Sequence, residues 1–345
     1  MKSLLRLLLK SQHQQNLSKL PQTEKGMTLI ELLIGTVMAF LILTPMLAFV
    51  VDMLNTDRRE QVKANTEQDI QAAVDFIAQD LSQAIYIYDN STTNGIPKIS
   101  SFLPLTTATQ TPILVFWKRQ LQRNALPYAP TAPNTPAPDT CDSGTVCNDT
   151  YVLSLVAYYK VSASDPTWCE PKGNPCPNRI VRYQIRDGLK DPQATGASPY
   201  YTSVETGQKI SAAYNRSFDI SKPTENVTLG SNFWDPQSQD VLVNYIDHNP
   251  VALTGNECQT ALSKPRTTDS SNALIDETTL KITDGPTNQT NSFYACVDTA
   301  RNLARVTIRG NSLRRLQPDA NYDANRSAFF PTASVQVQGL GARGK

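Results

Sequence analysis

The hydrophobic positions of the chain gather first in one long run, at residues 27–51. Within these 25 residues a single side chain, Glu31, carries a charge. At a helical rise of about 1.5 Å per residue the run would span about 37 Å, and the hydrocarbon core of a bilayer is about 30 Å thick. The pattern therefore predicts a transmembrane helix over residues 27–51, with one carboxylate near its start.

After this run the spacing of apolar side chains becomes that of an amphipathic helix. Apolar residues recur at steps of three or four, which places on one helical face Ile70, Val74, Ile77, Leu81 and Ile85. Pro45 removes one backbone hydrogen bond and is a candidate kink, and no further proline occurs until Pro97. We therefore expect one helix from residue 27 to residue 88, whose continuation over residues 52–88 packs on a folded domain.

From residue 89 onward, short apolar runs alternate with polar segments rich in Pro, Ser, Thr and Asn. The runs have the composition of strands and lie at residues 113–118, 151–161, 179–187, 240–247, 293–298 and 303–310. Alternation within 179–187 and 303–310 predicts antiparallel strands with one buried and one wet face. The polar segments 126–149, 191–232 and 261–290 are expected to be loops. Together these features predict an α+β protein whose β-rich domain covers residues 89–345.

The charge distribution predicts how the apolar helix is oriented. The whole chain has a formal net charge of +1, so no general basic field indicates nucleic-acid binding. Residues 1–26, however, contain five basic residues and one acidic residue. Positive charge in front of the helix predicts a cytoplasmic N-terminus and a domain on the outer side. The apolar run is too long for the core of a cleavable secretory signal, which has about 7–15 residues.

All six cysteines lie beyond the apolar run, which agrees with an oxidising compartment. They are Cys141, Cys147, Cys169, Cys176, Cys258 and Cys296. None of their spacings is C-x-x-C, so zinc and thioredoxin-type sites are disfavoured. We predict disulfides between neighbours in sequence order, although six cysteines allow 15 connectivities and free buried thiols are the alternative.

The segment KGMTLIELLI at residues 25–34 resembles the signature of type IV prepilins. That family has a short basic leader ending in glycine, followed by a Thr-Leu-Ile-Glu run that opens a transmembrane helix. The resemblance implies that residues 1–26 are a leader, cut between Gly26 and Met27 after Lys25 by a prepilin peptidase that then methylates the new amino terminus. Met27 departs from the phenylalanine usual there. In the family, the glutamate that corresponds to Glu31 pairs with the terminal amine of a neighbouring subunit.

The resemblance extends to a narrower group. The helical segment AAVDFIAQDLSQAIYIY resembles that of the larger minor pseudopilins, the J/W type, and the long Pro- and Cys-containing domain with the ending FFPTASVQVQGLGARG resembles the C-type pseudopilins of cyanobacterial hormogonium polysaccharide secretion. This implies a type IV pilin-like fold: a long transmembrane and amphipathic helix packed on an antiparallel sheet domain with disulfide-stapled loops.

The resemblance also implies a function without catalysis. A minor pseudopilin would join the tip or priming complex of a pilus or secretion filament that supports polysaccharide export and surface motility. Its partners would be other pilins, the prepilin peptidase, membrane lipid, and an inner-membrane assembly platform with its cytoplasmic ATPase; polysaccharide is a further candidate. The protein would start as a single-pass inner-membrane protein with a periplasmic domain and end in a filament at the cell surface.

Two other functions remain open at this point. The first is a pilus minor pilin that binds a surface, a sugar or DNA through a basic stripe, formed by Arg179, Arg182 and Arg186 or by Arg305, Arg309, Arg314 and Arg315. The second is a membrane-anchored enzyme that acts on polysaccharide with a carboxylate pair such as Asp235 and Asp240. Charged strand faces are more often simply solvated, and no motif aligns the two acids.

No cofactor is expected, with one candidate exception. The stretch DANYDAN alternates oxygen ligands in the manner of a calcium loop, at Asp319, Asn321, Asp323 and Asn325. It lacks the glycine of the sixth loop position, where Ala324 stands, and the acid of the twelfth, where Phe330 stands. An ordinary Asx-rich turn explains the same residues.

Overall fold

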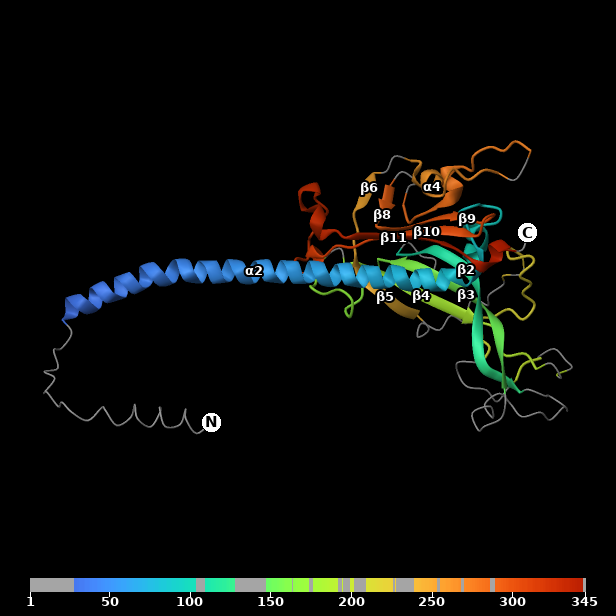
Figure 1. The fold of residues 1–345 in the computed structure, drawn as a ribbon, viewed down its shortest axis with the longest axis horizontal. Coiled ribbons are helices and arrows are strands. Elements are labelled where there is room, and N and C mark those ends of the chain that lie inside the picture. Colours follow the sequence, from blue (N-terminus) through green and yellow to red (C-terminus); the bar gives the residue numbers. More distant parts are fainter. Residues whose placement is uncertain are drawn as a thin grey trace, which may run out of the picture. The chain divides into compact units, whose positions relative to one another are not determined.

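The computed structural model describes residues 28–103, 109–127, 147–162, 164–173, 176–191, 194, 199–201, 209–225, 227, 239–252, 255–267, 270–285 and 289–343. The chain divides into two compact units, Met1–Asp57 and Arg58–Lys345. Helix α2 (Leu29–Ser82) begins in the first unit and ends in the second (Figure 1). The remaining elements belong to the second unit, which combines helix and antiparallel sheet, so the α+β class is confirmed.

Helix α2 confirms most of the predicted helix but is shorter at its C-terminal end. It runs through Pro45 and stops at Ser82 instead of residue 88. The next residues form strand β1 (Ala84–Ile87), which pairs antiparallel with β2. Its sequence AIYI is rich in β-branched and aromatic residues, which favour a half-buried strand. The prediction for 83–88 was wrong because Ile85 happens to continue the helical spacing.

Five strands of the second unit form one antiparallel sheet in the order β1-β2-β3-β4-β5. A second antiparallel sheet has the order β11-β10-β9-β7, and β6 pairs with β8. Beyond β1, the strands are β2 (Gln110–Pro127), β3 (Cys147–Val161), β4 (Asn178–Arg186), β5 (Gln239–Ile246), β6 (Pro250–Ala252), β7 (Lys281–Ile282), β8 (Gln289–Asn291), β9 (Phe293–Asp298), β10 (Leu303–Arg309) and β11 (Thr332–Gln338).

Short helical turns connect these strands. They are α3 (Ile96–Ile99), α4 (Glu257–Ala261), α5 (Glu277–Leu280), η2 (Ser100–Phe102), η6 (Leu313–Arg315), η7 (Ala324–Phe329) and η8 (Leu340–Arg343). All six predicted strand segments are strands. The prediction that residues 261–290 form a loop was wrong, because this segment contains α5, β7 and the first residues of β8. Strands β2 and β3 also extend into the ends of the predicted loop 126–149.

The two strands with predicted wet faces behave differently. In β10 the alternation is confirmed, since Ala304, Val306 and Ile308 are fully buried and their neighbours are half-buried. In β4 the prediction was wrong. Both of its faces are covered, and Arg182 is 8% exposed because it pairs with a carboxylate of α2. The polar residues of β4 therefore face a polar partner and not water.

One continuous apolar core joins α2 to both larger sheets. The predicted apolar face of the helix is confirmed, because Ile70, Val74, Ile77 and Leu81 are each at most 2% exposed. Gly310, after β10, allows the closest approach. A Cβ atom there would lie 2.3 Å from Ile70 Cδ1 and 2.8 Å from a methyl carbon of Thr66. A larger residue at 310 would require the Ile70 and Thr66 side chains to shift.

Two of the three predicted disulfides are confirmed, Cys169–Cys176 and Cys258–Cys296. The first closes a small loop between β3 and β4, and the second ties α4 to β9. Cys147 is also disulfide-bonded. Cys141 lies outside the described residues.

Candidate assembly site on the long helix

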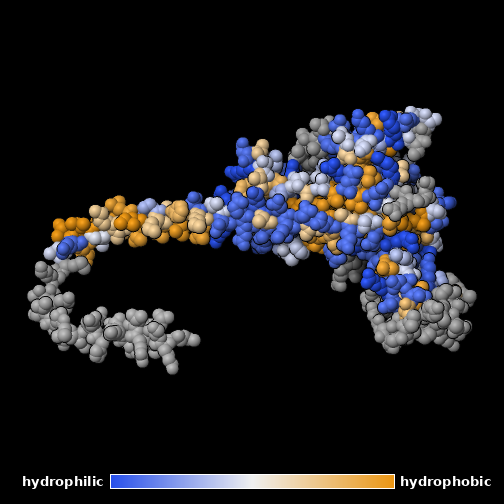
Figure 2. Space-filling model, viewed as in Figure 1, coloured by the Kyte–Doolittle hydropathy of each residue, from blue (hydrophilic) through white to orange (hydrophobic). Residues whose placement is uncertain are grey.

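The part of α2 in the first unit presents apolar side chains on every side. Each large apolar residue from 29 to 54 is between 48% and 84% exposed. Figure 2 shows these side chains as an apolar stretch at the start of the helix. Soluble proteins rarely expose apolar patches of more than a few hundred Å². The described part of the chain contains one helix long and apolar enough to cross a membrane, and this segment belongs to it.

Glu31 closes the N-terminal end of α2 through a capping box with Thr28. The Glu31 carboxylate accepts hydrogen bonds from the Thr28 backbone N–H at 3.2 Å and from the Thr28 hydroxyl at 3.1 Å. In return, the Glu31 N–H lies 3.4 Å from the Thr28 hydroxyl oxygen. The sequence Thr-x-x-Glu in front of an apolar run is the signature of this motif, in which N-cap and third helical residue satisfy each other's N–H groups.

The capping box gives Glu31 a role that needs no second subunit. A carboxylate in the first helical turn is also stabilised by the helix dipole, typically by about 0.3–1 kcal/mol. Both effects occur in an isolated chain. They explain why an acidic residue stands at position 31. The capping box alone, however, would not require a negative charge at this position, since a glutamine can also close it. The predicted processing residues Lys25, Gly26 and Met27 lie outside the described residues.

At its other end, α2 is fastened to the five-stranded sheet by a buried charged cluster around Asp80, which is 6% exposed. Lys118 Nζ of β2 lies 2.7 Å from Asp80 Oδ1, and Arg182 Nε of β4 lies 2.8 Å from Oδ2. The Tyr158 hydroxyl of β3 donates to the same Oδ2 at 2.7 Å. Three adjacent strands thus hold one helical carboxylate.

The cluster continues across the sheet through side-chain amides. Arg182 also donates to Gln184 Oε1 at 2.7 Å, and Gln184 donates to Gln120 Oε1 at 2.6 Å. Burial by itself would raise the pKa of Asp80, but the charges and hydrogen bonds of Arg182 and Lys118 outweigh it and lower that pKa. Asp80 is therefore ionised at neutral pH, as a carboxylate between two cations should be.

The structure does not bring the predicted basic residues together as an exposed stripe. Arg179 and Arg182 are 8% exposed and Arg314 is 1% exposed. Arg309 forms an ion pair with Asp247 at 2.6 Å, and Arg315 pairs with Asp69. Arg186 donates to the Lys209 carbonyl and Arg305 to the Ser334 hydroxyl. Arg179, Arg182 and Arg314 are thus buried in the domain, whereas Arg186, Arg305, Arg309 and Arg315 are half-buried, and DNA or surface binding by these residues stays an untested alternative.

The calcium candidates form turns. Asp323 accepts a hydrogen bond from the Asn325 N–H at 2.9 Å and starts η7, and Asn321 Oδ1 lies 3.0 Å from His248 Nε2. Asp319 is exposed. No cluster of three or more acidic, histidine or cysteine side chains suited to a metal occurs in the described ranges. Of the candidate acid pair, Asp240 is exposed on β5 and Asp235 lies outside those ranges.

Sequence reasoning included Thr28 in the prepilin-like signature but missed its capping role, and it missed Asp80 altogether. The first carried a signal, because Thr-x-x-Glu before an apolar run predicts a capping box. The second carried a weaker one, since Asp80 sits beside Leu81 on the helical face marked as buried. Comparisons with protein-family models, with curated proteins and with solved structures returned no match.

Proposed function

We propose that the protein is a minor pseudopilin, a membrane-anchored subunit that assembles into a filament through the first part of α2. The observation that carries this proposal is the apolar segment of residues 29–54, which is exposed on every side, has Glu31 near its start and continues into a helix fastened to a sheet domain. The resemblance of residues 25–34 to prepilins points in the same direction.

The exposed helix needs an apolar partner on all sides. Burial of a large apolar side chain contributes roughly 1.5–3 kcal/mol. Lipid can supply this environment before assembly, and neighbouring helices can supply it afterwards. The two environments compete closely because lipid tails are as apolar as leucine. A specific polar interaction is therefore needed to favour the filament, and Glu31 is the charged residue available within residues 28–51.

Glu31 can provide that preference after the leader is removed. In lipid its charge is held by the capping box alone, with a desolvation cost that is largest at the bilayer centre and smaller near the helix end. In a filament its carboxylate would meet the Met27 amine of a neighbouring subunit. Charge-assisted hydrogen bonds are roughly twice as strong as neutral ones and are directional. The pair would set the axial register between subunits.

The Asp80 cluster has a matching mechanical role in this proposal. Movement of a subunit out of the membrane would pull on α2, and the domain must follow. A helix held by apolar contacts and by ion pairs to β2 and β4 resists sliding, since a shift by one residue would bury Asp80 without its partners. The outer part of the domain would carry the contacts with cargo.

The partners follow from this assignment: other pilins or pseudopilins, a prepilin peptidase, membrane lipid, and an assembly platform with its ATPase. Polysaccharide is the proposed cargo, and surface motility the outcome. The protein would pass from the inner membrane, with its domain in the periplasm, to a filament at the surface. We propose a tip or priming position, because a large domain would crowd a uniform fibre.

Two measurements on producing cells test the proposal. The intact mass of the mature protein should correspond to cleavage between Gly26 and Met27 with one added methyl group. Deletion of the gene should reduce exported polysaccharide. An uncut chain that never enters sheared surface filaments would contradict the proposal. Loss of pili with normal export would favour a pilus minor pilin that acts in adhesion.

A further inference from the structure

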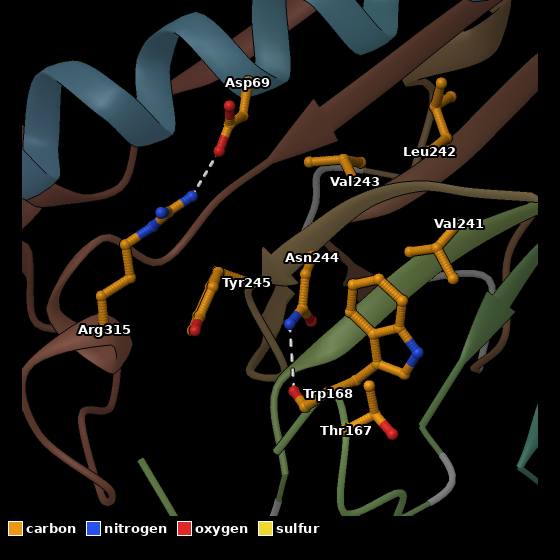
Figure 3. A pocket seen from close by; sticks show the side chains of 9 residues that line it. All are labelled: Asp69, Thr167, Trp168, Val241, Leu242, Val243, Asn244, Tyr245 and Arg315. Atoms are coloured by element: carbon orange, nitrogen blue, oxygen red, sulfur yellow. Dashed lines mark hydrogen bonds and ion pairs between the residues drawn. The ribbon is translucent and has the colours of Figure 1, made fainter. Parts of the chain in front are cut away.

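A tryptophan stands at the centre of a shallow groove along the open edge of the five-stranded sheet. Trp168 lines a hollow of about 370 Å³ (Figure 3) and also a second hollow of about 570 Å³, and Val241 of β5 lines both. Strand β5 is the last strand of its sheet among the residues that the structure describes. The groove is separate from the exposed helix segment and from the Asp80 cluster.

Several interactions fix Trp168 in place. Its backbone N–H donates to the Asp165 carbonyl at 3.1 Å, and its backbone carbonyl accepts a hydrogen bond from Asn244 Nδ2 at 3.0 Å. The next residue, Cys169, is held by the disulfide to Cys176. Yet the indole is only half-buried. A partly exposed aromatic residue on a backbone that is already fixed by hydrogen bonds and a neighbouring disulfide is typical of binding anchors.

The end of β5 beside the tryptophan has an unusual backbone. Tyr245, which lines the same hollow, has a φ of 60°, a left-handed conformation rarely adopted by bulky residues. It is held by a hydrogen bond from the Asn311 N–H to its carbonyl at 2.8 Å and by the Arg315 guanidinium 4.4 Å above its ring. Such conformations concentrate at ligand sites, because the surroundings must impose them.

The charges of the groove exclude anionic ligands. Its charged side chains are three acids, Asp69, Asp165 and Asp240, and two arginines, Arg179 and Arg315. Both arginines are already paired, with Asp165 and Asp69 respectively. The remaining charge is therefore negative. Nucleic acid and anionic lipid need free cations, so neither fits this surface.

The uncharged lining is suited to hydroxyl groups. The neutral polar residues that line the two hollows are Gln110, Ser164, Thr167, Gln239 and Asn244. Amides and hydroxyls can each donate and accept hydrogen bonds. A pyranose ring presents an apolar face of C–H groups with hydroxyls around its rim. An aromatic platform bordered by neutral donors and acceptors matches both parts of such a ring.

We propose that the groove around Trp168 binds a neutral oligosaccharide, with one sugar ring stacked on the indole and its neighbours in the two flanking hollows. This site is independent of filament assembly by α2. It would let the domain contact glycan whether or not the protein acts as a pseudopilin.

Calorimetric titration of the full-length chain tests this proposal. The protein is kept in a zwitterionic detergent without a sugar headgroup, since a glycoside detergent would compete for the site. The probes are neutral hexasaccharides of glucose, mannose, galactose and N-acetylglucosamine. We expect at least one to bind, and Trp168→Ala to weaken it by at least about tenfold. Trp168→Phe, which keeps an aromatic platform, should retain most of the affinity.

Two controls separate the site from general effects. Tyr151→Ala removes an aromatic side chain that is 55% exposed on β3 outside the groove, and should leave binding unchanged. Removal of Cys169–Cys176 should weaken binding, whereas removal of Cys258–Cys296 should not, provided that both variants stay folded. Absence of binding by every hexasaccharide, or equal binding by Trp168→Ala, would overturn the proposal. Binding of a (Thr-Val)₄ peptide without binding of any hexasaccharide would also overturn the proposal, because it would show that the groove accepts an extended peptide as an added strand beside β5.

Discussion

Removal of the Asp80 carboxylate should destabilise the domain far more than removal of an exposed carboxylate from the same helix. In Asp80→Ala, Lys118 and Arg182 stay in the interior without their counter-charge, and the Tyr158 hydroxyl loses its acceptor. Loss of one partner from a buried ion pair costs about 3–5 kcal/mol. Because native domains are stable by only about 5–15 kcal/mol, the change removes a large part of the total.

The assay is thermal unfolding of the full-length chain in detergent micelles, followed by near-ultraviolet circular dichroism. For a unit of this size, 1 kcal/mol corresponds to about 2–4 °C in Tm, so a cost of about 3–5 kcal/mol in Asp80→Ala should lower Tm by roughly 6–20 °C. The matched control is Asp75→Ala on the same helix. Asp75 is exposed and accepts one hydrogen bond, from Gln71 at 3.0 Å. We expect its loss to change stability by no more than about 0.5 kcal/mol.

A double-mutant cycle shows whether the effect comes from the ion pair itself. Lys118→Met should cost less than Asp80→Ala, since Arg182 still balances the carboxylate. The two changes together should cost less than the sum of the single changes, because the double variant leaves one unpaired charge fewer. If Asp80→Ala melts within 2 °C of Asp75→Ala, or if the two costs simply add, the cluster does not fasten the helix in the way described here.

The remaining predictions concern pH, packing and cross-links. The pKa of Asp80 is lowered in the folded state. The stability that ionised Asp80 contributes is therefore present above its unfolded pKa of about 3.9 and is lost as pH falls through the folded pKa. When Tm is measured against pH in the acid range, Tm should fall less steeply in Asp80→Asn than in the native protein. Gly310→Ala places a methyl against α2 and should cost about 1–3 kcal/mol, whereas Gly35→Ala, with open space around it, should leave the domain Tm unchanged. Replacement of Cys258 and Cys296 by serine removes a bridge across 38 residues and should cost about 2–4 kcal/mol in denaturant unfolding; an unchanged midpoint would show that the bridge adds nothing.

Local periodicity predicted those parts of the fold in which neighbouring residues decide the structure. The buried helical face from Ile70 to Leu81 and the alternation of β10 were both correct for this reason. Strand β11 was missed, although its sequence TASVQVQ alternates in the same way as β10. The helix end was wrong because Ile85 continued the spacing while its aromatic neighbours favoured a strand.

The polar interior could not be predicted from spacing. Asp80 is separated from Lys118 by 38 residues and from Arg182 by 102, and only the sheet order brings them together. The alternation of β4 therefore suggested a solvent-exposed face, whereas in the structure its Arg182 pairs with the buried Asp80 carboxylate. The groove around Trp168 depends on a turn, a disulfide loop and an edge strand, which are likewise distant in the sequence. The capping box at the N-terminal end of α2, in contrast, joins residues only three positions apart, so its motif can be recognised from the sequence.

The central claim is that the charge of Glu31 serves assembly, beyond its part in the capping box. Three variants separate the two roles. Glu31→Gln removes the charge but keeps a third-position side chain that can close the capping box. Thr28→Val removes the cap hydroxyl but keeps the carboxylate, and Glu31→Val removes both.

The decisive measurement is the amount of each variant in sheared surface filaments, relative to its amount in the membrane, in cells that lack the native protein. The account predicts that Glu31→Gln is lost from filaments as fully as Glu31→Val, while Thr28→Val enters them at close to the native level. Normal incorporation of Glu31→Gln, together with loss of Thr28→Val, would contradict it and would leave Glu31 as a helix cap alone.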